Sequence, residues 1–156
     1  MDMAQTQIQC YTVFMDPKDE LKYIRFKQRF SNFEKAYAMF DEISKRDTEH
    51  DEVVRMALTQ AFEITFELAW KAMGDKLESE KKSDGDDTFP REIIRKAYEA
   101  KYVDDQNLWT KALENRNKSS HAYSEEFAIE LEKFLRVDYA PALKKLYEYF
   151  RGSLNK

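Results

Sequence analysis

The sequence predicts an all-α protein, an antiparallel bundle of about five helices, and two observations support this. The 156 residues include only three glycines and three prolines, which leaves little of the turn chemistry that many short strands need. Apolar residues recur at spacings of three and four along most of the chain, and charged residues, 36% of the total, lie between them. This pattern is typical of amphipathic helices with solvated outer faces.

The N-terminal residues differ from the rest. Residues 8–14 are rich in strand-favouring side chains and are followed by Pro17, so we interpret 1–17 as an N-terminal arm or tail and 18–156 as the bundle domain. A first helix is expected from Leu21 to between residues 44 and 47. Its aromatic residues share one helical stripe, which favours a core face over a cofactor site. They are Phe26, Phe30, Phe33, Tyr37 and Phe40.

A second long helix is expected over residues 51–80, and it carries two neighbouring apolar stripes. A broad apolar face of this kind is what a central helix needs to contact several neighbours. One stripe is Val54, Leu58, Ala61, Thr65, Leu68 and Ala72, and the other is Phe62, Phe66, Trp70, Met73 and Leu77.

Three shorter helices are expected after the polar loop at 83–88. A proline begins the third, which ends near residue 100, and an aspartate caps the fourth, which fades near residue 117. A serine followed by two glutamates begins the fifth, and a later proline is expected to kink or restart it. The residues that mark these boundaries are Pro90, Asp104 or Asp105, Ser124 and Pro141.

Composition also excludes several classes of protein. The net charge of −4 provides no global basic field for a long polyanion, although a local basic site is compatible with it. The single Cys10 excludes an internal disulfide and a cysteine metal cluster, and it fits a reducing compartment. No apolar run approaches the roughly 20 residues that span a bilayer, and no signal peptide is evident. We therefore expect a cytoplasmic protein that has no cofactor, no metal site and no membrane contact.

One polar segment, residues 116–123, interrupts the helical pattern between the fourth and fifth helices. It contains Arg116, Asn117 and His121, and the other histidine, His50, lies in a predicted surface loop. Five residues along an ideal helix turn a side chain by about 140°. Arg116 and His121 can therefore share a site only if the helix ends between them, which Asn117 and the two serines favour.

This set suits RNA cleavage without a metal ion. A histidine can take a proton from a 2′-hydroxyl or give one to the leaving oxygen, and an arginine can stabilise the charge on the transition state. Asn117 can orient either group. A structural interpretation stays open, in which Arg116 pairs with an acidic residue of the second helix and His121 caps a helix or packs at an interface.

Other residues have both a functional and a structural interpretation. Glu63 and Glu67, one turn apart on the second helix, suit a metal ion or the orientation of Arg116, but a structural ion pair of Glu67 is favoured. A basic run on the first helix suits RNA phosphates, and two tryptophans suit base stacking. For the basic run a solvated face is favoured instead, and for the two tryptophans packing in the core or at an interface is favoured. These residues are Lys22, Arg25, Lys27, Arg29, Trp70 and Trp109.

Four segments, in order, carry a resemblance to a known family. They are RFSNFEKA at 29–36, FEITFELAWK at 62–71, PREIIRKA at 90–97 and RNKSSHAY at 116–123. From about residue 21 to residue 150 the chain resembles the nucleotidyltransferase substrate-binding protein family, a branch of the HEPN superfamily. The resemblance implies a helical bundle that forms a homodimer and is encoded with a minimal nucleotidyltransferase partner.

The resemblance also implies roles for the polar segment. HEPN ribonucleases have an arginine, a polar residue, a few variable positions and a histidine, which Arg116, Asn117 and His121 match, and two copies usually meet across the dimer. In HEPN toxins the partner modifies a tyrosine two residues after the histidine, the position of Tyr123. Glu67 and Ser120 are expected to support this site.

Three hypotheses follow from the sequence. The first is a toxin-like, metal-independent RNA endonuclease of a toxin–antitoxin-like system, silenced by nucleotidylation of Tyr123. The second is a non-catalytic subunit that presents a substrate or its own surface to the nucleotidyltransferase, and the third is a structural helical dimer. The chain lacks a Gly-Ser turn followed by metal-binding aspartates on a strand, so it is not expected to transfer nucleotides itself.

Overall fold

The computed structural model describes residues 16–47, 51–86, 88–119 and 124–154, and helices are the regular structure within these ranges. The predicted all-α bundle is confirmed. The N-terminal arm expected over 1–17 lies almost entirely outside the described residues, so it stays a prediction.

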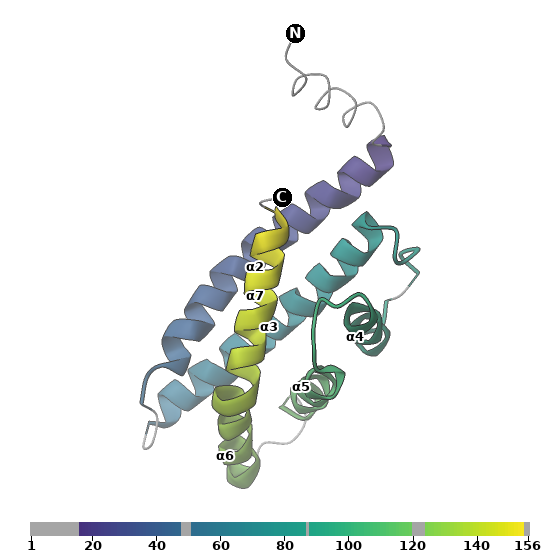
Figure 1. The fold of residues 1–156 in the computed structure, drawn as a ribbon. Coiled ribbons are helices and arrows are strands. Elements are labelled where there is room, and N and C mark those ends of the chain that lie inside the picture. Colours follow the sequence, from purple (N-terminus) through teal and green to yellow (C-terminus); the bar gives the residue numbers. More distant parts are fainter. Residues whose placement is uncertain (1–15, 48–50, 87, 120–123, 155–156) are drawn as a thin grey trace.

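Two long helices, α2 (Pro17–Ser44) and α3 (Glu52–Ser79), lie side by side as an antiparallel hairpin (Figure 1). The predicted start of the first helix at Leu21 is wrong by four residues. The Asp16 carboxylate accepts a hydrogen bond from the backbone N–H of Lys18 at 3.1 Å, and Pro17 occupies the first turn, where its missing donor costs nothing. The predicted start and end of the second helix are confirmed to within one residue.

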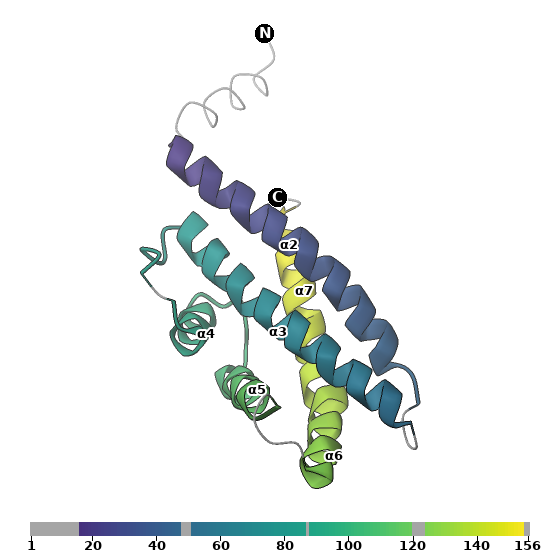
Figure 2. The same cartoon turned by 180° about the vertical axis from the view of Figure 1, so that it is seen from behind.

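The central position expected for the second helix is also confirmed, because α3 contacts α2, α4, α5 and α6. The helices α4 (Pro90–Glu99) and α5 (Gln106–Ser119) are seen nearly end-on in Figures 1 and 2, so they cross the hairpin steeply. At the start of α4, Phe89 occupies the cap position and supplies no side-chain hydrogen bond. The fourth helix extends two residues beyond its predicted end near residue 117.

The last three elements form one continuous column: α6 (Glu125–Phe134), the π-helical turn η1 (Leu135–Tyr139) and α7 (Ala140–Leu154) (Figure 1). Ser124 caps α6 as predicted, since its hydroxyl accepts from the Phe127 N–H at 3.1 Å. The kink or restart of the helix that was expected at Pro141 takes the form of a π-helical turn just before this residue. The Ala140 N–H bonds back to the Leu135 carbonyl, and this longer loop precedes the residue that has no N–H to donate.

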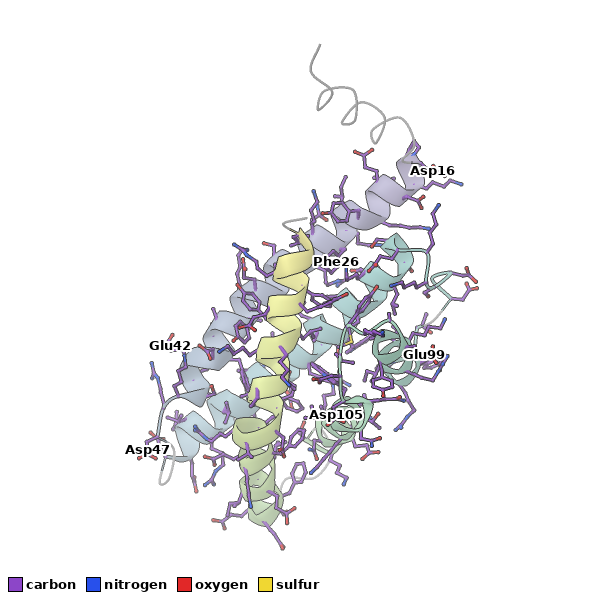
Figure 3. All side chains as sticks on the ribbon, in the orientation of Figure 1. Asp16, Phe26, Glu42, Asp47, Glu99 and Asp105 are labelled. Atoms are coloured by element: carbon purple, nitrogen blue, oxygen red, sulfur yellow. The ribbon has the colours of Figure 1, made fainter. Side chains whose placement is uncertain are left out.

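The core lies between the α2–α3 hairpin and α7, with α4 and α5 closing its other side. Phe26, labelled in Figure 3, points inward and its ring packs edge-on against Phe150 of α7 with centroids 5.3 Å apart. The predicted aromatic stripe of the first helix is confirmed as core: Phe26, Phe30, Phe33 and Phe40 are buried, and Tyr37 packs against them. Trp109 is fully buried and Trp70 partly buried, as the structural interpretation favoured.

Two arginines of the basic run on the first helix contact a carboxylate of α3. The Arg29 Nε donates to the Asp75 carboxylate at 2.9 Å, and Arg25 contacts the same carboxylate at 3.6 Å. The interpretation of this run as a solvated face holds for Arg25, which is exposed, whereas Arg29 is partly buried in its ion pair with Asp75. Within the described residues, no helix is long and apolar enough to cross a membrane.

Candidate functional site

Helix α5 holds Arg116 in place through its buried face. Trp109, Ala112 and Leu113 are buried against the core, and this fixes the rotation of the helix about its axis. Arg116 follows Ala112 by four residues, so its side chain leaves α5 on the side that faces α3. The helix is described as far as Ser119, and residues 120–123 lie outside the described residues, so its end between Arg116 and His121 stays a prediction.

The Arg116 guanidinium pairs with Glu67 of α3. The Nη2 atom lies 3.0 Å from Glu67 Oε2, and both side chains are partly exposed, Arg116 at 40%. Glu67 also accepts from the Trp70 indole at 3.2 Å and pairs with the Lys71 ammonium at 3.0 Å. The predicted ion pair between Arg116 and an acidic residue of the second helix is confirmed, and that residue is Glu67.

Glu67 is held in its charged form. Partial burial by itself raises the pKa of Glu67, but hydrogen bonds from Lys71 and Trp70 and the charges of Lys71 and Arg116 outweigh it. The net result is a pKa below the usual value for a glutamate. Glu67 is therefore ionised at neutral pH and suited to orient Arg116, rather than to act as a general acid or base.

The Ser119 hydroxyl, on the last turn of α5, lies within hydrogen-bond distance of Glu63, one turn before Glu67 on α3. This hydroxyl lies 2.8 Å from Glu63 Oε1 and 2.8 Å from the Arg116 carbonyl, and its single hydrogen serves one of them at a time. Glu63, for which sequence reasoning left a metal role open, is thus engaged with a hydroxyl. Among the described residues, no group of three histidine, cysteine, aspartate or glutamate side chains is arranged to hold a metal ion.

An open surface hollow of about 500 Å³ lies over this pair of helices. Its lining combines Arg116 and the two glutamates with amide and apolar side chains, namely Gln60, Ile64 and Leu68. A guanidinium carries five N–H donors, so pairing with Glu67 leaves donors for an anionic ligand that enters the hollow. The arrangement can therefore hold a phosphate or carboxylate beside α5.

The structure brings together only some of the predicted site residues. Arg116 and Glu67 are in contact, and Asn117 is exposed on the last turn of α5. Ser120, His121 and Tyr123 lie outside the described residues, so their roles stay predictions. Sequence reasoning missed Ser119 and Lys71, although the spacing of Lys71, four residues after Glu67, is a signal for an ion pair on one helix.

A family model matches most of the chain. Residues 28–151 match the family model described as "nucleotidyltransferase substrate binding protein like". The chain belongs to this family. The matched range includes α3, α5 and the polar segment, so the Arg116–Glu67 pair lies on the part of the chain that the family shares. No curated protein matches the chain.

Two solved structures are similar to this family member. A protein of Thermus thermophilus is 28% identical over 80% of this chain and 99% of its own, with a TM-score of 0.65. A protein of Haemophilus influenzae is 21% identical over 81% of this chain and 96% of its own, with a TM-score of 0.59. The second structure is described as the fold of a substrate-binding domain of a nucleotidyltransferase, and at this identity the likeness shows the fold alone.

Proposed function

We propose that this chain is the HEPN-type subunit of a two-component nucleotidyltransferase system, and that its homodimer cleaves RNA without a metal ion. The observation that carries the proposal is the Arg116 guanidinium, held by Glu67 at the edge of an open hollow five residues before His121. In this reaction the 2′-oxygen of RNA attacks the adjacent phosphorus and the 5′-oxygen leaves. The products are a 2′,3′-cyclic phosphate and a 5′-hydroxyl.

Each residue has a distinct role in this reaction. His121 moves the proton from the 2′-hydroxyl or to the leaving 5′-oxygen, and Arg116 stabilises the added charge on the phosphorus oxygens. Asn117 and Ser120 support these two groups. Glu67 positions Arg116 without touching substrate, because its carboxylate already accepts from Arg116, Lys71 and Trp70.

A homodimer would bring two such sites together. The exposed face of α3 beside the hollow carries the apolar side chains Val53, Met56 and Ile64, and Ile64 lines the hollow with Arg116. Exposed apolar side chains in one stripe are typical of a helix that packs on a partner. Met56→Glu with Ile64→Glu should give monomers by light scattering, whereas Met39→Glu on α2, equally exposed, should leave the dimer intact.

The partner nucleotidyltransferase would silence the enzyme at Tyr123. The tyrosine oxygen attacks the α-phosphorus of a nucleoside triphosphate, pyrophosphate leaves, and the phenolic proton passes to a base on the partner. The added phosphate and base would block the site by charge and by volume. Labelled triphosphate should enter the chain only with the partner present. The label should disappear in Tyr123→Phe and persist in Tyr98→Phe, a variant of an exposed tyrosine on α4.

The decisive experiment is RNA cleavage by the purified dimer in EDTA. We expect His121→Ala and Arg116→Ala each to lose about 10²- to 10⁴-fold in rate, the range for a catalytic acid–base or charge-stabilising group. His50→Ala, the other histidine, and Arg91→Ala, an exposed arginine of α4, serve as matched controls.

The second candidate function is a non-catalytic substrate-binding subunit of the nucleotidyltransferase. The description of the family favours it, and so does the engagement of Arg116 by Glu67. An unmodified wild-type dimer that leaves several RNA substrates intact would select this function over the ribonuclease.

A further inference from the structure

A second concave surface lies between α5 and the column formed by α6 and η1. It encloses about 420 Å³, and we name it the α5–α6 groove after the residues that line it, among them Lys111, Asn115, Lys118, Phe127, Lys133 and Phe134. Lys111, Asn115 and Lys118 are spaced by four and three, so they share one face of α5, a different face from that of Arg116.

The three lysines of the groove have no carboxylate partner in the part of the chain that the structure describes. Within the described residues, no carboxylate oxygen lies within 4.0 Å of the ammonium nitrogens of Lys111, Lys118 or Lys133. The arginines of α2 and α4, by contrast, are paired: Arg29 with Asp75 and Arg95 with two glutamates. In a chain of net charge −4, this groove is therefore a place where positive charge stays available to a ligand.

Aromatic side chains form the floor beside these cations. The Lys111 ammonium lies 5.1 Å from the centre of the buried Phe134 ring, and Phe127 is only partly buried. An aromatic ring at the base of a lysine-lined groove can stack on a nucleobase while the ammonium groups contact phosphates. The groove thus offers both kinds of contact that a single nucleic-acid strand uses.

The spacing of the lysines favours a ligand with several phosphates. Lys111 and Lys118 leave α5 seven residues apart, about 10 Å along the helix axis. The same helix carries Arg116 near its end, so a strand that follows the lysines of α5 passes toward the candidate site. We propose that the α5–α6 groove binds single-stranded RNA, with Lys111, Lys118 and Lys133 on its phosphates and Phe127 against a base. This assignment rests on the proposed ribonuclease function and names the path of its substrate.

The test is direct binding of a labelled single-stranded RNA by fluorescence anisotropy, which needs no cleavage. Replacing Lys111, Lys118 and Lys133 together by Gln should weaken binding at least about tenfold and reduce the slope of log affinity against log salt by about 2. The matched control replaces Lys18, Lys35 and Lys144 by Gln, three exposed lysines of α2 and α7 that remove the same charge away from the groove. This control should bind as the wild type does.

Two carboxylates also line the groove, and they give a test of opposite sign. Glu130 and Asp138 should repel the phosphates, so Glu130→Gln with Asp138→Asn should tighten RNA binding by about threefold or more. Circular dichroism and thermal unfolding of every variant would separate a lost contact from a lost fold.

Three results would overturn the assignment. They are no RNA binding by the wild type at low salt, equal binding by the groove and control triple variants, and full displacement of RNA by an equimolar amount of ATP, which would indicate a mononucleotide pocket. RNA that binds through the lysines but is not cleaved would retain the groove and reject the ribonuclease. RNA that is cleaved but binds equally well without the three lysines would retain the ribonuclease and reject the groove.

Discussion

The hydroxyl oxygens of Thr65 on α3 and Tyr139 in η1 lie 2.9 Å apart in the fully buried core. Thr65 also lies 3.1 Å from the Phe62 carbonyl, which can only accept, so the threonine hydrogen goes there and Tyr139 donates to Thr65. Burial raises the pKa of Tyr139, so its hydroxyl keeps the proton that it donates. Thr65 therefore has the Phe62 carbonyl as the acceptor for its proton, whereas Tyr139 donates its own proton to Thr65.

This asymmetry predicts unequal costs for two conservative substitutions. Tyr139→Phe leaves Thr65 its carbonyl acceptor and should lower the free energy of unfolding by about 0.5–1.5 kcal/mol. Thr65→Val leaves the buried Tyr139 hydroxyl without its acceptor and should lower it by about 1–3 kcal/mol. Urea unfolding measures both. The double variant should be more stable than Thr65→Val alone, and a larger cost for Tyr139→Phe would show that the hydrogen-bond direction is reversed.

Glu67 should affect turnover more than stability. The Arg116–Glu67 pair is partly exposed and screened, so Glu67→Gln should change the free energy of unfolding by less than about 1 kcal/mol. Under the proposed function, loss of orientation of Arg116 should lower kcat by about tenfold. KM should not rise, because the carboxylate that competes with substrate phosphate is gone. A rise in KM with unchanged kcat would contradict a positioning role.

Stability should depend on the ionisation of Glu80 at acid pH. Partial burial by itself raises the pKa of Glu80, but hydrogen bonds from Tyr102 and Lys76 and the charges of Lys76 and Lys82 outweigh it and lower the pKa. A carboxyl with a lowered pKa in the folded state stabilises above its unfolded pKa, about 4.3, and that contribution disappears as pH falls through the folded value. The difference in unfolding free energy between wild type and Glu80→Gln should be largest near pH 7 and shrink below about pH 4. A difference independent of pH would contradict this.

Two glycines should respond to alanine with opposite signs. Gly85 has a φ of +82°, and a Cβ there would lie 2.5 Å from Glu78 Oε1, so Gly85→Ala should destabilise by about 1 kcal/mol or more. Gly152 lies in α7 with open space around it, and Gly152→Ala should stabilise by up to about 1 kcal/mol. Thermal unfolding of both variants beside the wild type tests the pair, and a shift in the same direction would refute it.

A capping residue before Pro90 should stabilise α4. Phe89 is 73% exposed in an extended cap conformation and supplies no hydrogen bond to the first turn. Phe89→Asp should add that bond and a favourable charge, with a gain of about 0.5–2 kcal/mol. Phe89→Ala removes the same ring without adding a cap and serves as the control. Equal stability of the two variants would mean that the aspartate does not cap the helix.

The fold was predictable because its core follows local spacing. Phe26, Phe30, Phe33 and Phe40 lie on one stripe at helical intervals, and the structure buries all four. The start of α2 was missed because the cap at Asp16 follows closely on residues 8–14, whose composition resembles a strand. Periodicity locates the buried face of a helix well, but its ends depend on single capping contacts.

The candidate site was predictable only in part. The sequence left the pairing of Arg116 with an acidic residue of the second helix open as one interpretation. Whether Arg116 meets Glu63 or Glu67 depends on the relative positions of α5 and α3 along their axes. The groove lysines gave no sequence signal, since Lys133 lies near Lys111 only after α6 packs beside α5. The roles of His121 and Tyr123 stay predictions.

The π turn in the last column has a consequence for how the chain tolerates insertions and deletions. Nineteen residues separate Leu131 from Phe150, and at about 100° per residue an unbroken α-helix would leave their side chains about 100° apart. Both are buried in the same core, because the extra residue of η1 removes that offset. Deleting one residue within 135–139 should therefore restore α geometry and leave α6 aligned with α7, because the remaining eighteen residues make five whole turns at about 100° each. Inserting one residue there should instead swing the groove-lining face of α6 by about a quarter turn relative to α7. The number of residues in this turn, more than the identity of any side chain in it, sets the direction in which the α5–α6 groove opens.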